Sequence, residues 1–175
     1  MKKPKLTALC GMMTALSVVL MFFTTFLPVL MYVLPIVTGI IVLLIKEVSN
    51  RKWASAVYFA TAILSLLLIT DKEAALTYAL FFGYYPIIRD FVQKLPKLLA
   101  WTIKIFLFNV AAVLVGVTGV YIFGLSAEEY SEFGKATVPI LLSLANVVFL
   151  MYDVIFNKYD FLFKYAADKL KRTMK

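Results

Sequence analysis

The chain has 175 residues, of which 63% are hydrophobic and 16% charged, and its mean hydropathy is +0.91. A soluble domain is about 45–50% apolar and about 25% charged, so we expect much of the surface of this chain to face lipid. Histidine is absent and Cys10 is the single cysteine, which excludes an internal disulfide framework, a Cys/His zinc site and any catalytic dyad that uses histidine.

Apolar segments recur along the whole chain, and a helix needs about 20 apolar residues to span hydrocarbon. We predict an all-α polytopic membrane protein, a bundle of six transmembrane helices in one domain over residues 1–175. The predicted segments are 6–26, 27–45, 53–70, 73–88, 98–125 and 137–156. Pro28 and Pro35 favour a break after the first segment, because proline lacks a backbone N–H and clashes with the preceding helical turn.

The first segment carries small residues along one side. Thr7, Gly11 and Ala15 recur at every fourth position, with Ala8 beside them, so they share one face of a helix. Small residues at this spacing allow another helix to approach closely in lipid. Packing against the protein's own helices would also explain such a stripe.

The fourth segment contains polar residues in its outer half and helix-perturbing residues in its inner half. Glu73 and Thr77 are one turn apart and therefore share a face, with Tyr78 next to them. We expect Gly83 and Pro86 either to kink the helix or to let a neighbouring element approach closely.

The fifth and sixth segments contain intramembrane polar residues, which are costly in lipid and often functional. Lys104 and Asp153 both fall in the cytoplasmic half, so they can form an ion pair, although Lys104 can also extend to the headgroups. Asn109 and Asn146 lie near mid-depth. They either hydrogen-bond to each other and hold two helices together, or one of them faces a ligand cavity.

The basic residues are divided unequally between the two sides that six spans define. Fifteen of the 18 lysine and arginine residues share the side of the termini, Lys72 and Lys135 lie on the other side, and Lys104 lies within a span. Cytoplasmic loops carry such an excess of basic residues. We therefore predict a multi-pass membrane protein with both termini cytoplasmic. A cleaved signal peptide is disfavoured, because the first apolar run exceeds an h-region of about 7–15 residues.

The basic tail, residues 157–175, mixes aromatic and basic side chains at helical spacing. Phe161, Tyr165, Lys169 and Arg172 favour an amphipathic helix on the inner leaflet, although a solvated tail that only anchors topology has the same composition. The formal net charge of +8 is explained by attraction to anionic lipid, so no nucleic-acid partner is expected.

No pattern for catalysis is present. Paired carboxylates on one face and a nucleophile with a suitably spaced base are both missing, and no G-x-x-x-x-G-K-[ST] phosphate loop occurs. We therefore predict that the chain is not an enzyme, has no catalytic or metal-binding residues, and uses no cofactor.

The stripe Gly11-x-x-x-Ala15, continued by Thr7 and Ala8 after a short basic N-terminus, resembles the first helix of the substrate-binding S component of energy-coupling factor (ECF) transporters. In that family an alanine-x-x-x-alanine stripe docks on a transmembrane coupling subunit; here Gly11 replaces the first alanine. The proline-containing link ending at Pro35 and Gly39 also resembles the family's connection between helices one and two. The resemblance covers residues 1–40 by motif and the whole chain by architecture.

The resemblance implies a prokaryotic plasma membrane as the location, a function and a set of partners. An S component binds a vitamin or similar micronutrient in an outward cavity lined by loop one and helices four to six. A coupling subunit and two cytoplasmic ATPases then reorient it to release the ligand inside. Carried over by helix and depth, the implied ligand-binding residues are Thr77, Tyr78, Tyr121 and Asn146. The alternative is a small, non-transporting membrane scaffold of an envelope or cell-shape complex, which also has several short-looped spans and few charges.

Overall fold

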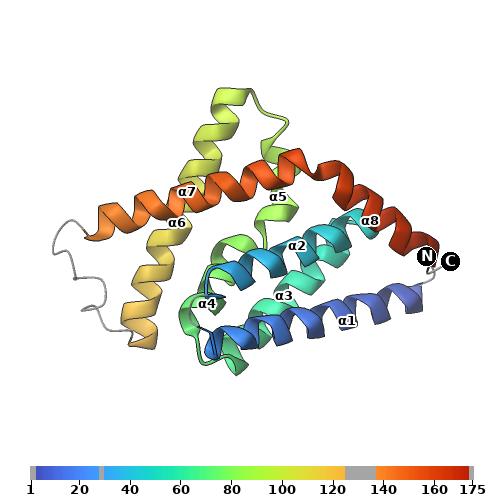
Figure 1. Ribbon diagram of the computed structural model, residues 1–175, viewed down its shortest axis with the longest axis horizontal. Helices are drawn as coiled ribbons and strands as arrows, with labels where there is room; N and C mark the ends of the chain where they lie inside the picture. The colour runs from blue at the N-terminus through green and yellow to red at the C-terminus, as the bar shows by residue number, and fades with distance from the viewer. Residues whose placement is uncertain (1–2, 28–29, 125–136, 174–175) are drawn as a thin grey trace.

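The computed structural model describes residues 3–27, 30–124 and 137–173 (Figure 1). These residues form helices and no strand, so the predicted all-α class is confirmed for them. In chain order the elements are α1 (Lys3–Phe22), the 3-10 turn η1 (Phe23–Thr25), α2 (Val33–Val48), α3 (Arg51–Leu68), α4 (Lys72–Thr77), the π-helical turn η3 (Tyr78–Phe82), α5 (Tyr85–Val92), α6 (Lys97–Phe123), α7 (Thr137–Lys158) and α8 (Asp160–Thr173).

The first two predicted segments are separated by a longer connection than expected. α2 begins at Val33, whereas the sequence predicted a start at residue 27. The Thr24 hydroxyl donates a hydrogen bond to the Met21 carbonyl oxygen over 2.9 Å, which occupies an acceptor at the end of α1. Pro35 lies in the first turn of α2, where a missing N–H breaks no intrahelical hydrogen bond.

The fourth predicted segment is three short helices instead of one. The Asp71 carboxylate caps α4 by accepting a hydrogen bond from the Ala74 N–H over 3.1 Å. The Gly83 N–H then bonds to the Tyr78 carbonyl oxygen over 2.8 Å, which is the wider i→i+5 turn of a π-helix. A Cβ at Gly83 would lie 2.6 Å from the Tyr58 ring, so the expected interruption and the expected close approach both occur here.

Two groups of helices make up the molecule. α1, α2 and α3 pack side by side, and α8 returns from the end of α7 to pack along α2 (Figure 1). On the other side of the molecule α6 contacts α4, η3 and α7. The segment α4–η3–α5 therefore lies between the first three helices and α6, and it contacts both groups.

Each group has its own core. The first core joins α1, α2, α3 and α4, and includes Ala167 of α8. The second core is largely aromatic and joins η3, α5, α6 and α7. In it the Phe108 and Phe149 rings stack with centroids 4.8 Å apart. Gly39 brings α2 against this second core, because a Cβ there would lie 2.5 Å from the Phe82 carbonyl oxygen.

Three of the described helices are long and apolar enough to cross a membrane: Lys3–Thr25, Lys97–Phe123 and Pro139–Lys158. Only 17% of the most apolar window of α6 and 22% of that of α7 is buried within the chain. Lipid is the solvent that matches such exposed apolar surface. The chain therefore has the helices of a membrane protein, and the count of six spans stays a prediction.

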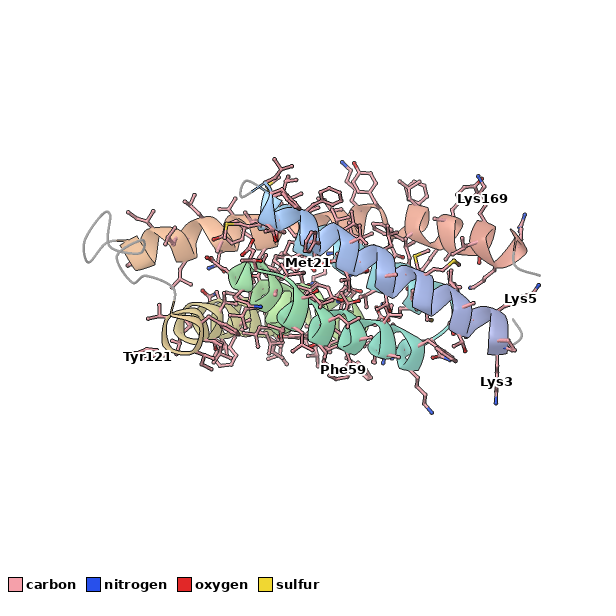
Figure 2. All side chains as sticks on the ribbon, turned by 90° about the horizontal axis from the view of Figure 1, so that it is seen from below. Lys3, Lys5, Met21, Phe59, Tyr121 and Lys169 are labelled. Atoms are coloured by element: carbon pink, nitrogen blue, oxygen red, sulfur yellow. The ribbon has the colours of Figure 1, made fainter. Side chains whose placement is uncertain are left out.

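The ends of the molecule differ in character. Figure 2 shows Lys3, Lys5 and Lys169 toward one end and Tyr121 toward the opposite end. This arrangement agrees with the unequal division of basic residues in the sequence. In α8, Ala167 is buried, whereas Phe161 and Tyr165 are exposed. The tail is thus helical over Asp160–Thr173, and its position on the inner leaflet stays a prediction.

Candidate functional site

A cavity of about 570 Å³ lies between α4, η3, α6 and α7. Its walls are mainly apolar, and they include the aromatic side chains of η3 and small residues of α6 and α7. Representative lining residues are Phe81, Phe82, Phe108, Ala111, Gly116, Val120, Leu141 and Ala145. A cavity of this size and character is typical of small-molecule sites, which measure about 300–1,000 Å³ and are mostly apolar with a few polar groups.

The polar groups of this cavity come from three elements. Tyr32 precedes α2 and donates a hydrogen bond from its hydroxyl to Glu73 Oε1 over 2.8 Å. Glu73 lies in the first turn of α4, and Thr77 lies one turn further along the same face. Tyr121, near the end of α6, is 84% exposed. These four side chains all line the cavity.

Of the four ligand-binding residues that the resemblance implied, two line the cavity and two do not. Thr77 and Tyr121 line the cavity. Tyr78 does not, because successive helical residues point about 100° apart and its neighbour Thr77 occupies the cavity side. Tyr78 is fully buried in the core that joins α1, α2 and α3. Asn146 also lies outside the cavity lining.

Asn146 pairs with Asn109 instead. Each side-chain amide donates to the other's oxygen over 3.0 Å, and each also donates to a backbone carbonyl one turn earlier in its own helix. Such reciprocal bonds satisfy both amides at mid-depth and join α6 to α7. Of the two roles the sequence allowed, the structure shows the interhelical one.

Tyr32 and Glu73 line the cavity although the sequence did not predict them as ligand-binding residues. Glu73 was visible as the acidic residue on the Thr77 face. Tyr32 carried no comparable signal, because its contact with Glu73 spans 41 positions and depends on how α2 packs against α4.

Lys104 and Asp153 form a buried ion pair in the second core. Lys104 Nζ lies 2.8 Å from Asp153 Oδ2 and 2.9 Å from Oδ1. The Tyr85 hydroxyl donates to Oδ1, and Asn157 Nδ2 donates to Oδ2 over 3.0 Å. Lys104 therefore pairs within the bundle and does not extend to the headgroups. The carboxylate is fully surrounded by donors from α5, α6 and α7.

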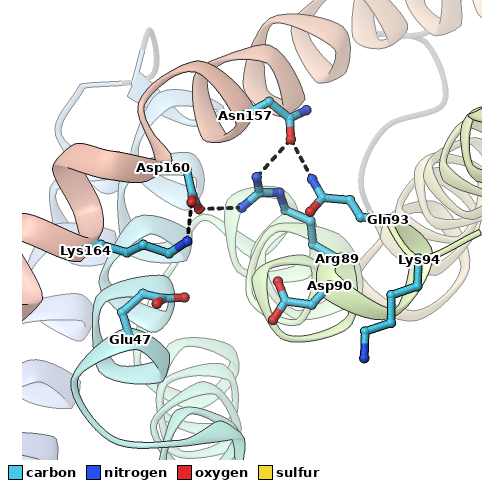
Figure 3. Close-up of a pocket in the computed structure, with 8 residues that line it drawn as sticks. All are labelled: Glu47, Arg89, Asp90, Gln93, Lys94, Asn157, Asp160 and Lys164. Atoms are coloured by element: carbon cyan, nitrogen blue, oxygen red, sulfur yellow. Dashed lines mark hydrogen bonds and ion pairs between the residues drawn. The ribbon is translucent and has the colours of Figure 1, made fainter.

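A second, polar cavity of about 520 Å³ lies where α2, α5, α7 and α8 meet (Figure 3). Arg89 is buried there and donates to Asn157 Oδ1 over 2.8 Å, while its second terminal nitrogen lies 3.6 Å from Asp160. Asp160 also pairs with Lys164 at 2.6 Å. These contacts join α5 to the junction of α7 and α8.

Asp90, on the rim of the polar cavity, is paired with α2 and α3. Lys46 Nζ lies 2.9 Å from one carboxylate oxygen, and Arg51 lies 3.3 Å from the other. Partial burial acts to raise the pKa of Asp90, but the hydrogen bonds and charges of Lys46 and Arg51 outweigh it and hold the pKa below its ordinary value of 3.8.

The small-residue stripe of α1 faces outward. Thr7, Ala8, Gly11 and Ala15 are all exposed, and a Cβ added at Gly11 would meet nothing within 4 Å. The buried residues of α1 lie on its other side: Leu6, Leu9, Cys10, Ser17 and Met21. The chain's own helices therefore pack against the larger residues and leave the stripe uncovered.

Within the described ranges, no group of three or more Cys, Asp or Glu side chains is placed to hold a metal ion. Comparison of the chain with protein-family models, with curated proteins and with solved structures found no match. The features that bear on function are therefore the apolar cavity and the exposed stripe of α1.

Proposed function

We propose that this chain is the substrate-binding membrane subunit of a vitamin-type micronutrient uptake transporter, an S component energised by separate ATPase subunits. The observation that carries the proposal is the apolar cavity of about 570 Å³ lined by α4, η3, α6 and α7. These elements belong to the fourth, fifth and sixth predicted segments, which are the helices that line the ligand cavity in that family.

In this proposal the chain crosses the plasma membrane six times, and the fourth crossing runs from α4 through η3 into α5 and ends at Ile88, before Asp90. The ends that carry Lys3, Lys5 and Lys169 face the cytoplasm, so the Tyr121 end faces outward (Figure 2). The cavity mouth, marked by Tyr121, Glu73 and Tyr32, then opens to the outside, where a nutrient is captured. α8 lies along the inner leaflet with Phe161 and Tyr165 toward lipid.

The partners in this proposal are a transmembrane coupling subunit and two cytoplasmic ATPases. The exposed face formed by Thr7, Ala8, Gly11 and Ala15 is the docking surface for a helix of the coupling subunit. Open space at Gly11 is what close backbone approach in lipid requires. The absent phosphate loop in this chain fits a division of labour in which other subunits hydrolyse ATP.

Native mass spectrometry of the full chain, purified gently from its own host, tests the proposal. We expect a retained small molecule and co-purifying ATPase and coupling subunits. Recovery with envelope-assembly proteins, without a small molecule and without ATPases, would favour the membrane scaffold. The Gly116→Trp variant is the matched control and should lose the retained small molecule. Nothing lies within 4 Å of a Cβ at Gly116, so the backbone accepts the tryptophan, whose indole would fill the cavity.

A further inference from the structure

Among the described residues that line the apolar cavity, Glu73 is the only charged one. We propose, building on the function proposed above, that the ligand is a mostly apolar molecule with one cationic head, such as a protonated amine, and that Glu73 binds this head. Three features of the site support this ligand: the hydrogen-bonding capacity of the Glu73 carboxylate, the lack of a cation among the described lining residues, and the apolar character of the remaining walls.

The Glu73 carboxylate can accept further hydrogen bonds. Tyr32 donates to Oε1 over 2.8 Å, and no ion pair of Glu73 occurs within the described residues. A carboxylate has about four lone-pair positions, so one bond from Tyr32 leaves Oε2 available to a ligand donor. Glu73 is partly exposed, so a cationic group can reach its carboxylate, and the negative charge favours a ligand of positive charge.

The neighbouring lysine is engaged elsewhere. Lys72 Nζ donates to the carbonyl oxygens of Leu66 and Ile69 over 2.8 and 2.7 Å, and it lies 5.9 Å from the centroid of the Phe123 ring. These contacts hold the ammonium group at the end of α3, and Lys72 does not line the cavity. The described lining therefore presents a carboxylate without a balancing cation, which disfavours an anionic ligand.

The remaining walls define the body of the ligand. Phe81 and Phe108 stand edge to face with centroids 4.9 Å apart, and the small side chains of Ala111, Ala145 and Gly116 leave the space between the helices open. Aromatic edges and aliphatic walls suit a flat or branched apolar body. Tyr32 is hydrogen-bonded to Glu73, and Thr77 lies one turn from Glu73, so a single polar end of a ligand can contact all three.

Glu73 also lies in the first turn of α4, where backbone N–H groups stabilise negative charge. A carboxylate placed there only to support the helix would show no selectivity for ligand charge. Charge selectivity is therefore the readout that separates a binding role from a structural one.

The test uses three probes that share a naphthyl body and differ in the head: 2-(1-naphthyl)ethylamine, 2-(1-naphthyl)ethanol and 1-naphthylacetate. Their binding to the full chain in phosphatidylcholine nanodiscs is measured by equilibrium dialysis, with empty nanodiscs correcting for partition into lipid. We expect the amine to bind about tenfold more tightly than the alcohol, and the carboxylate to bind most weakly. Glu73→Gln should lower amine affinity to that of the alcohol and leave alcohol affinity unchanged.

Asp71→Asn is the matched control. It removes a negative charge two positions away, outside the cavity lining, and asparagine caps a helix as well as aspartate does. This variant should keep the preference for the amine. Gly116→Trp should abolish binding of all three probes, which places them in the cavity.

Equal affinity for the amine and the carboxylate, an amine preference that survives Glu73→Gln, or failure of the amine to bind would overturn the ligand class. If the coupling and ATPase subunits still co-purify, none of these results contradicts the proposed function. Loss of that co-purification, with the amine preference intact, would instead overturn the transporter assignment alone.

Discussion

Lys104 and Asp153, 49 positions apart in the sequence, form an ion pair in which both carboxylate oxygens lie within 2.9 Å of the ammonium nitrogen. The side chain of Lys104 is 6% exposed and that of Asp153 is fully buried. The pair joins α6 to α7 inside the aromatic core. Breaking one partner leaves a buried charge without compensation, whereas replacing both with apolar groups removes the desolvation cost as well.

Lys104→Met is therefore expected to lower the free energy of unfolding by about 3–5 kcal/mol, because Asp153 then lies buried without its counter-ion. The double variant Lys104→Met/Asp153→Leu should recover most of that loss. Thermal or denaturant unfolding of the detergent-solubilised chain measures both. If the single variant were as stable as the parent chain, the ammonium group would have to lie at the headgroups in the membrane.

Gly39 permits the contact between α2 and the aromatic core. A Cβ there would lie 2.5 Å from the Phe82 carbonyl oxygen and 2.6 Å from the Tyr152 hydroxyl. Gly39→Ala should therefore destabilise the chain by about 1–3 kcal/mol through overpacking. Gly116→Ala is the control, because its Cβ would meet nothing within 4 Å and alanine favours a helix. Equal melting temperatures for the two variants would contradict the packing described for α2.

The α1 stripe should behave as a partner surface. Gly11→Leu or Ala15→Leu is expected to abolish co-purification with the coupling subunit, because the added carbons would keep the two backbones apart. The isolated variants should keep the parent melting temperature, since both positions are exposed. Ala56→Leu, an equivalent change at an exposed position of α3, should leave partner binding intact. Unfolding of isolated Gly11→Leu would show that the stripe packs internally.

Asp90 makes stability depend on acidity. Lys46 and Arg51 hold its pKa in the folded chain below 3.8, so the folded state binds the proton less readily than the unfolded state. The stabilisation is complete above the unfolded-state pKa and is lost as the pH falls from about 4 through the folded-state pKa. Because the carboxylate is 38% exposed, the effect should be about 1 kcal/mol or less. The free energy of unfolding, measured at decreasing pH, should fall less steeply below about pH 4 in Asp90→Asn than in the parent chain.

Membrane sidedness is testable with cysteine labels. Ser126, which lies outside the described residues, belongs to the predicted outer loop, whereas Lys94 belongs to the predicted inner one. In a Cys10→Ala background, Ser126→Cys should react with an impermeant maleimide in intact cells, and Lys94→Cys should react only after permeabilisation. The reverse labelling pattern would invert the topology and close the proposed cavity to the outside.

The sequence determined the features that depend on composition and local spacing. Apolar length and the lack of strand-like alternation determined an all-helical membrane chain. The four-residue spacing in α1 placed Thr7, Gly11 and Ala15 on one face, and the structure leaves that face exposed. Depth within the fifth and sixth segments also allowed the Lys104–Asp153 pair, because both residues fall at the same level of two adjacent helices.

Tertiary structure alone decided which polar groups face the cavity. Thr77 and Tyr78 are adjacent and at nearly equal depth, yet one lines the cavity and the other is buried against α1, α2 and α3. That choice depends on the rotation of α4 and on the π-helical turn that follows it, which no local pattern specifies. Tyr32 reaches Glu73 only because the start of α2 packs against α4. A contact of that range depends on how the helices pack together, so periodicity and hydropathy could not reveal it.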